Sequence, residues 1–179
     1  MTNRRNFIRQ TAVAAAGAGL ATALPHRVYS GILGANDKLK CGLIGSKGMG
    51  MSNLRAFLGQ PNTQCVAICD VDQNILNERI ADTEKIQGSK PQGYSDFRKM
   101  LENKDIDIVI IGTPDHWHCI PFVNAAQLGK DIYCEKPLAN SIEECNIMER
   151  AVQKYNIVAQ VGQWQRSDPH WLDAVYYIR

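Results

Sequence analysis

A run of glycines between residues 45 and 50 has the spacing to bind phosphate. It reads Gly-Ser-Lys-Gly-Met-Gly and follows an apolar segment, Leu39 to Ile44. Glycines placed after a strand let the backbone turn tightly and approach a pyrophosphate, which then lies at a helix N-terminus. The G-x-G-x-x-G pattern is incomplete, because Lys47 stands at the second glycine position and Gly48 would have to supply the close approach. The candidate phosphate-binding residues are Gly45, Ser46, Lys47, Gly48, Met49 and Gly50, and a purely structural glycine turn is the alternative.

An acidic residue stands at the end of the next apolar segment. Asp70 follows the run Cys65 to Cys69 and lies twenty residues after Gly50. An acid at this place can accept hydrogen bonds from both ribose hydroxyls of an adenosine, and its charge repels a 2′-phosphate. With Asp72 nearby, Asp70 favours NAD as the cofactor over NADP. An ordinary aspartate in a turn is the alternative, but glycine run, strand and acid together indicate a dinucleotide site.

Two later loops could hold a substrate beside a cofactor. The first runs from Gly112 to His118 and reads Gly-Thr-Pro-Asp-His-Trp-His, and the second runs from Glu135 to Leu138 and reads Glu-Lys-Pro-Leu. In doubly wound folds, ligands bind at the carboxyl ends of the strands. A lysine there can stay charged and hydrogen-bond a substrate oxygen next to a nicotinamide ring, which makes Lys136 a candidate. Composition alone would leave Lys136 an ordinary surface residue.

Apolar segments alternate with helical patterns from residue 38 onward, and this order must position the loops. The expected strands cover residues 39–44, 65–69, 106–111, 131–134 and 157–161. The expected helices cover residues 52–58, 75–86, 97–101, 121–128 and 141–155, and another starts at Asp168. Ser141 and Glu144 form a capping box that opens the fifth of these helices. The alternation predicts an α/β fold with a doubly wound parallel sheet, a Rossmann-like domain.

Charge and cysteine content argue against several kinds of partner. The chain has 179 residues and a formal net charge of +2, but residues 1–30 contain four arginines and no acid. The remainder has 16 basic and 18 acidic residues, so electrostatics give no reason to expect nucleic acid or an anionic membrane as a partner. The six cysteines form no C-x-x-C pair and have no histidine at metal-ligand spacing, so no metal site is expected. We expect these cysteines to be small buried hydrophobes.

The N-terminus has the organisation of an export signal. Arg4 and Arg5 precede the apolar pair Phe7 and Ile8, and an uncharged, alanine-rich stretch covers residues 10–25. This stretch is too short and too weakly apolar to span a membrane, which takes about 20 strongly apolar residues. The arrangement resembles a twin-arginine signal, and a basic tail before a helix is the alternative. It predicts export by the twin-arginine translocation machinery, to the periplasm or otherwise outside the cytoplasm.

The two later loops resemble a known family. The runs Val-Ile-Ile-Gly-Thr-Pro-Asp-His-Trp-His and Gly-Lys-Asp-Ile-Tyr-Cys-Glu-Lys-Pro-Leu-Ala are similar to those of the Gfo/Idh/MocA oxidoreductases, and the similarity extends from Ala35 to the end of the chain. The resemblance implies that Lys136 is the catalytic residue and contacts both the substrate and the nicotinamide region. It implies that Glu135 helps to seat the nicotinamide ribose. Further cofactor contacts are implied for Thr113, Pro114, His118 and Gln163.

The same resemblance implies a domain organisation and an activity. Residues 1–34 would be the signal and linker, residues 35–162 the dinucleotide-binding domain, and residues 163–179 the start of a truncated substrate domain that supplies a further acid or base. The expected function is NAD(P)-dependent oxidation of a hydroxyl on a sugar, cyclitol or related polyol, with oligomers formed only by the full-length protein. Two alternatives stay open: an exported NAD-dependent glycosidase that oxidises its sugar transiently, and an inactive cofactor-binding fragment.

Overall fold

The computed structural model describes residues 38–178, which contain a six-stranded parallel sheet. The strands are β1 (Leu39–Ile44), β2 (Thr63–Cys69), β3 (Gln92–Tyr94), β4 (Ile108–Ile111), β5 (Asp131–Cys134) and β6 (Ala159–Val161). Their order is β3-β2-β1-β4-β5-β6, so the chain runs from β1 to one edge and then crosses back to build the other half. This order confirms the predicted doubly wound α/β fold. The predicted export signal and linker, residues 1–34, lie outside the described residues.

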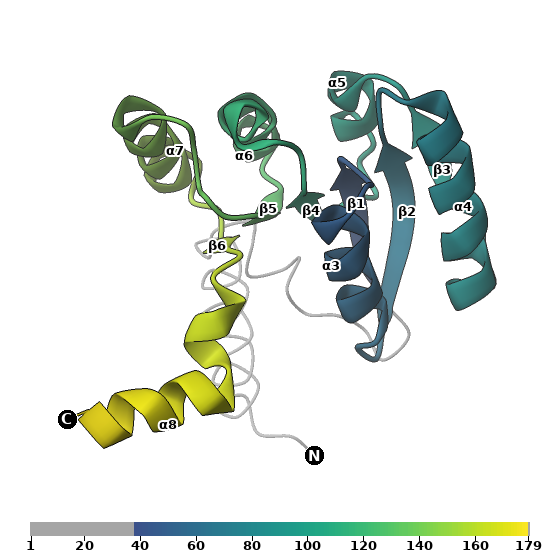
Figure 1. Cartoon of the computed structure of the whole chain (residues 1–179). Coiled ribbons are helices and arrows are strands. Elements are labelled where there is room, and N and C mark those ends of the chain that lie inside the picture. The colour runs from purple at the N-terminus through teal and green to yellow at the C-terminus, as the bar shows by residue number, and fades with distance from the viewer. Residues whose placement is uncertain (1–37, 179) are drawn as a thin grey trace, which may run out of the picture. The chain divides into compact units, whose positions relative to one another are not determined.

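Helices cover both faces of the sheet (Figure 1). They are α3 (Met49–Leu58), α4 (Gln73–Gln87), α5 (Phe97–Leu101), α6 (Cys119–Gln127), α7 (Ile142–Tyr155) and α8 (Pro169–Ile178), with short 3-10 turns η1 (Asp115–Trp117) and η2 (Trp164–Ser167). α3 and α4 pack on one face, and α5, α6 and α7 pack on the other. Within residues 38–178, none of the helices combines the length and the apolar character needed to cross a membrane.

The central strand β4 shows why this sequence forms a sheet buried on both sides. Its residues Ile-Val-Ile-Ile alternate between the two faces, as side chains on a strand must. Val109 and Ile111 belong to the apolar core under α5, α6 and α7, whereas Ile110 belongs to the core under α3 and α4. Continuous apolar sequence is therefore compatible with a strand here, because each face is covered by helices.

Helix ends follow the capping signals in the sequence. The Asp72 side chain accepts hydrogen bonds from the N–H groups of Asn74 and Ile75 and so begins α4. At the start of α7 the Ser141 hydroxyl accepts the N–H of Glu144 at 3.2 Å, while the Glu144 carboxylate accepts the N–H of Asn140 at 3.1 Å. This exchange is the predicted capping box, with the second bond displaced by one residue.

One strand, β3, has no counterpart among the predicted elements. It is three residues long, contains a glycine and lies at the edge of the sheet, with Ala67 of β2 opposite Gln92. Gly93 is so close to α4 that a Cβ there would lie 2.6 Å from the Ile80 side chain. The strand forms because β2 offers hydrogen-bonding partners, and the close approach of α4 requires glycine at position 93. Neither condition is visible in the local sequence.

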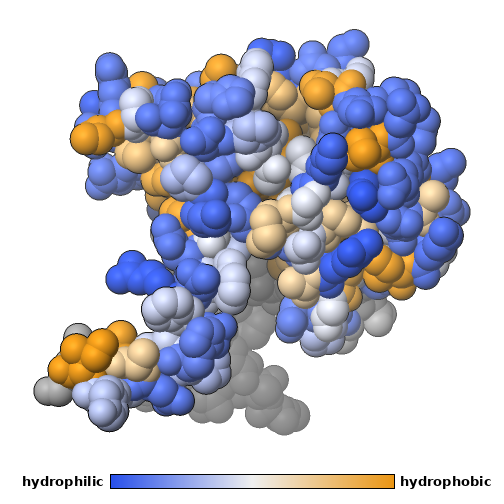
Figure 2. Space-filling view, viewed as in Figure 1, coloured by the Kyte–Doolittle hydropathy of each residue, from blue (hydrophilic) through white to orange (hydrophobic). Residues whose placement is uncertain are grey.

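The helix expected to start at Asp168 is α8, and its surface is unusually apolar. Trp171, Leu172 and Val175 are each more than 40% exposed, and the last turn adds Tyr176, Tyr177 and Ile178. Figure 2 shows the apolar residues of this helix gathered at its C-terminal end. The predicted boundary between a cofactor domain and a further domain at residue 163 stays a prediction.

Candidate functional site

The glycine run forms a tight turn between β1 and α3. Gly45 and Gly48 have φ angles of 79° and 52°, which side-chain-bearing residues rarely adopt. Lys47 is not among the described residues with positive φ, so a side chain fits at that position, and Gly48 takes the left-handed conformation in its place. The incomplete glycine pattern is therefore compatible with a complete turn.

Three glycines bring the turn into contact with the loop after β4. A Cβ on Gly112 would lie 2.5 Å from the Cα of Gly50, and a Cβ on Gly45 would lie 2.7 Å from the backbone nitrogen of Thr113. A Cβ on Gly50 would collide with the carbonyl oxygen of Gly45. Such distances exclude any side chain, so the two loops can meet at the sheet edge only with glycine at all three positions.

The helix that follows the turn begins without a cap. At the start of α3, Gly48 has no side chain to accept hydrogen bonds, and the first turn contains no acidic residue. The first N–H groups of a helix carry partial positive charge and need an acceptor. A phosphate group placed at this terminus would satisfy them.

Asp70 ends β2 and is bonded to the same turn. Its Oδ2 accepts the backbone N–H and the hydroxyl of Ser46, both at 2.8 Å. Its Oδ1 accepts the backbone N–H of Asp72 at 3.0 Å. The carboxylate is half-buried at the carboxyl end of the sheet, where the predicted ribose would lie.

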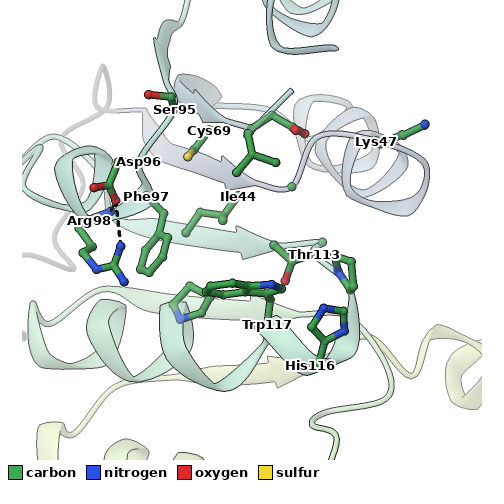
Figure 3. A pocket seen from close by; sticks show the side chains of 16 residues that line it. Ile44, Lys47, Cys69, Ser95, Asp96, Phe97, Arg98, Thr113, His116 and Trp117 are labelled. Carbon is green, nitrogen blue, oxygen red and sulfur yellow. Dashed lines mark hydrogen bonds and ion pairs between the residues drawn. The ribbon is translucent and has the colours of Figure 1, made fainter. Parts of the chain in front are cut away.

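A cavity of about 610 Å³ opens at the carboxyl ends of β1, β2 and β4. Phe97 from α5 and Trp117 from η1 both line it, and Figure 3 shows their rings close together, whereas Lys47 points away from both. The guanidinium of Arg98 lies 4.6 Å from the centre of the Phe97 ring and pairs with Asp96 at 3.4 Å. Two aromatic walls and a carboxylate at the rim suit a flat base joined to a ribose.

The loop after β4 offers a hydroxyl to this cavity. Thr113 lines the cavity, and its Oγ1 is buried without a hydrogen-bonding partner among the described residues. A buried hydroxyl is costly to leave unpaired, which indicates a ligand atom as its partner. The predicted cofactor residues on the cavity wall are Gly45, Lys47, Asp70, Thr113 and Pro114.

The loop after β5 carries the two charged candidates in different environments. Lys136 is exposed, and its ammonium has no ion pair within residues 38–178. Glu135 is only 4% exposed. Its Oε1 accepts the side-chain N–H of Asn53 at 2.8 Å, and its Oε2 accepts the backbone N–H of Lys136 at 3.1 Å. The lysine is therefore available to a ligand, while the glutamate holds the loop against α3.

The charge of Glu135 also acts on its neighbours. Burial raises the pKa of the Tyr133 hydroxyl, and the nearby carboxylate raises it further. Burial and then the same carboxylate raise the pKa of the Cys134 thiol to about 12. Both groups therefore stay neutral beside Glu135 at neutral pH.

The buried ring of His118 contacts both the loop after β4 and the loop after β5. Its ring is 1% exposed, with Nδ1 2.8 Å from the carbonyl oxygen of Pro137 and Nε2 2.8 Å from that of Thr113. The family resemblance implies a cofactor contact for His118, and in this geometry its influence would act through the two loops. Gln163 is exposed just beyond β6, and the preceding Gly162 packs so closely that a Cβ would lie 2.7 Å from the Oε1 of Glu135.

Three contributors to the site have no place among the predicted site residues. Asn53 lies on α3 one turn after Gly50 and bonds to Glu135. Its polar side chain stands between the apolar residues Met51 and Leu54 in the sequence, which was the only sign that it has a polar partner. From the sequence, Phe97 and Trp117 could be explained by packing alone. Only the fold places both of them on the wall of the cavity.

Among residues 38–178, no cluster of three or more histidine, cysteine, aspartate or glutamate side chains could hold a metal ion.

The sequence from residue 39 to residue 163 matches the profile of an oxidoreductase family with an NAD-binding Rossmann fold, the Gfo/Idh/MocA family. The chain belongs to this family. The resemblance seen in the two later loops is therefore confirmed, and the domain is an NAD-binding Rossmann domain. The site fits that cofactor, because glycines leave a backbone surface without side chains, α3 is uncapped and a buried hydroxyl lacks a partner.

Individual relatives of this family member are similar over only part of their length. A glycosyl hydrolase family 109 protein from Shewanella pealeana is 31% identical over 160 residues, covering 80% of this chain and 35% of the relative. The solved structure of an NAD binding oxidoreductase from Klebsiella pneumoniae is 28% identical with a TM-score of 0.60, over 69% of this chain and 34% of the other. Myo-inositol dehydrogenase from Lactobacillus casei, solved with NAD(H) and myo-inositol, is 25% identical with a TM-score of 0.68, over 74% and 38%. The chain thus spans roughly a third of the length of these relatives.

Proposed function

We propose that the protein is an NAD-dependent oxidoreductase acting on a hydroxyl of a sugar, cyclitol or related polyol. The observation that carries the proposal is the position of Lys136, unpaired and exposed at the same sheet edge as the glycine turn and Asp70. The myo-inositol dehydrogenase, 25% identical, supports the substrate class. When bound, NAD supplies the hydride acceptor, while the protein supplies binding, orientation and electrostatics.

The residues of the site would divide the work. The glycine turn and the N-terminus of α3 would hold the pyrophosphate, and Asp70 would accept a hydrogen bond from a ribose hydroxyl. Phe97 and Trp117 would flank the adenine. The ammonium of Lys136 would donate a hydrogen bond to the substrate oxygen. It would stabilise the negative charge that grows there as the hydroxyl proton passes to a base of the substrate domain that the family resemblance implies. Glu135 would keep that lysine in place through its bond to the Lys136 backbone N–H.

The test is an assay of the natural gene product for NADH formation with a panel of sugars and cyclitols. Lys136→Met should lower the rate with the best substrate by about 10²–10⁴, the range expected for loss of a proton-transfer or polarising group. Lys104→Met is the matched control, because Lys104 is exposed in the loop before β4, at the amino ends of the strands and away from the site. Tight NAD binding without oxidation of any member of the panel would contradict the substrate class and leave the cofactor site intact.

A second candidate is a glycosidase that oxidises its sugar transiently and restores the hydride before product release. It is favoured by the 31% identity with the glycosyl hydrolase family 109 protein. Release of free sugar from a glycoside with no net change in NADH would select this activity. Net NADH formation in step with substrate loss would select the dehydrogenase.

We also propose export through the twin-arginine pathway, which the pair Arg4 and Arg5 before an apolar stretch supports. An exported enzyme would meet little free NAD, so it would have to carry its cofactor from the cytoplasm. Replacing both arginines by lysine should retain the protein in the cytoplasm, as seen by cell fractionation. Unchanged export of the double variant would contradict the proposed route.

A further inference from the structure

Ser46 is the residue of the glycine turn whose side chain points into the protein. It is fully buried, whereas its neighbours Lys47 and Gly48 are exposed. The backbone N–H and the hydroxyl of Ser46 both donate hydrogen bonds to the Oδ2 of Asp70, each at 2.8 Å. The serine therefore joins the turn at the end of β1 to the acid at the end of β2.

The Asp70 carboxylate is held entirely by neutral donors. Besides the two bonds from Ser46, its Oδ1 accepts the N–H of Asp72, and no cationic side chain within residues 38–178 forms an ion pair with it. A carboxylate offers about four acceptor sites, so three bonds leave a place for a ligand hydroxyl. Because no ion pair neutralises it, Asp70 presents a negative charge to the cavity that it lines, where the guanidinium of Arg98 is paired with Asp96.

We propose that Ser46 determines cofactor specificity by fixing the carboxylate of Asp70. This inference rests on the proposed cofactor site and adds to it a residue that acts through another. The hydroxyl of Ser46 adds a second bond to Oδ2 and so restricts rotation of the carboxylate more than the backbone bonds alone would. An incoming 2′-phosphate therefore meets a negative charge that does not readily turn away. The same fixed carboxylate accepts a ribose hydroxyl without first losing rotational freedom. Ser46 is thus a positioning residue that favours NAD and disfavours NADP.

Ser46→Ala in the full chain tests the proposal, because it removes the hydroxyl and keeps the backbone N–H. Calorimetric titration with NAD and with NADP gives the ratio of the two dissociation constants. Because the less restricted carboxylate must then be ordered when the ribose binds, NAD binding should weaken by roughly tenfold. Binding of NADP should stay the same or improve, so the preference for NAD should fall by tenfold or more. Ser52→Ala is the matched control, since the Ser52 hydroxyl contacts only the Gly48 carbonyl oxygen, at 3.3 Å, and should leave the ratio unchanged.

The same experiment separates a specific role from a structural one. Equal weakening of NAD and NADP by Ser46→Ala, or tighter NAD binding, would overturn the proposal. If the alanine variant does not fold, Ser46→Cys keeps the packing with a weaker donor and should lower the ratio in the same direction. In an Asp70→Asn background the serine change should have no further effect on the ratio, and an independent effect there would also overturn the proposal. Absence of NAD binding by the wild-type chain would instead refute the proposed function.

Discussion

At the scale of single residues, the glycines, which have no side chain, matter to the site as much as the charged residues do. Gly50 is in contact with the backbone of Gly45 and Gly112, so it joins the turn after β1 to the loop after β4. The two loops form the floor on which the pyrophosphate would lie. The cofactor site therefore depends on a close backbone contact that any Cβ would break.

We predict that Gly50→Ala abolishes measurable NAD binding, because the new Cβ collides with the Gly45 carbonyl oxygen and drives the loops apart. Calorimetric titration of the full chain is the measurement. Gly59→Ala is the control: Gly59 ends α3 with a φ of −73°, and a Cβ there would approach no atom outside its neighbours closer than 3.4 Å. Wild-type affinity in the Gly50 variant would show that the turn does not hold the cofactor.

At the scale of elements, the loops after β4 and β5 are joined by one buried side chain. The ring of His118 contacts a carbonyl oxygen of each loop, and the ring of no other described residue makes two such contacts. Lys136 immediately precedes Pro137, whose carbonyl oxygen is one of these two partners. The position of the candidate catalytic lysine is thus set partly by a residue at the start of α6.

His118→Ala should lower the free energy of unfolding by about 2 kcal/mol or more, because it removes a buried ring that contacts a carbonyl oxygen of each loop and creates a cavity. Denaturant unfolding measures the change. The exposed His170, bonded only to Asp168, is the comparison, and its alanine variant should change stability by less than about 0.5 kcal/mol. A loss for His118→Ala as small as that expected for the His170 variant would mean that the His118 contacts add nothing to stability.

The start of α4 gives a second test at this scale. Asp72→Ala removes the side chain that caps Asn74 and Ile75 and should cost about 1 kcal/mol of stability. The bond to Asp70 comes from the backbone N–H of residue 72, which alanine keeps, so NAD affinity should be unchanged. A loss of NAD affinity without loss of stability would show instead that the Asp72 carboxylate acts on the cofactor.

At the scale of the whole molecule, the two ends of the parallel strands differ in role. The candidate site lies at the carboxyl ends of the strands, and a buried lysine just before β5 packs at their amino ends. Lys130 is 6% exposed, and its ammonium donates to the carbonyl oxygens of Asn103 and Ile106 at 2.7 and 2.9 Å. Burial lowers the pKa of this lysine below its ordinary value of 10.5.

Lys130→Met should therefore lower stability by about 1–3 kcal/mol without changing NAD affinity. Between the lowered pKa and pH 10.5, the folded protein binds fewer protons at Lys130 than the unfolded chain does, so the wild type gains stability relative to the variant as pH rises. Below the lowered pKa the difference should be constant. Unfolding measured across alkaline pH tests the slope, and a difference that narrows with rising pH would contradict the assignment.

The buried cysteines provide a further global test. Burial raises the pKa of Cys69 and Cys134 to about 12, so the thiolate fraction of each near pH 8 is about one part in ten thousand. In the folded protein a thiol reagent should modify Cys145 first, because it is the only one of the six cysteines that is not buried. All six should react after denaturation. Rapid modification of five or six thiols in the native protein would contradict the described core.

The local sequence determined the order of the elements and the chemistry of the carboxyl edge. Apolar runs, caps and the glycine turn act over a few residues, so their spacing predicts β1, α3, β2 and the later strand–helix units. The Glu-Lys-Pro loop identified the family for the same reason, since its residues are contiguous. Gly45, Asp70 and Lys136 could therefore be named as site residues from the sequence.

Only the tertiary structure decided how those parts meet. β3 forms because β2 lies beside it, and the cavity walls come from Phe97 on α5 and Trp117 on η1, which are distant in sequence. The bond from Ser46 to Asp70 spans 24 residues, and the bond from Asn53 to Glu135 spans 82. Packing of distant segments against one another creates these contacts. The residue pattern of a single segment does not indicate which distant residue each side chain will contact.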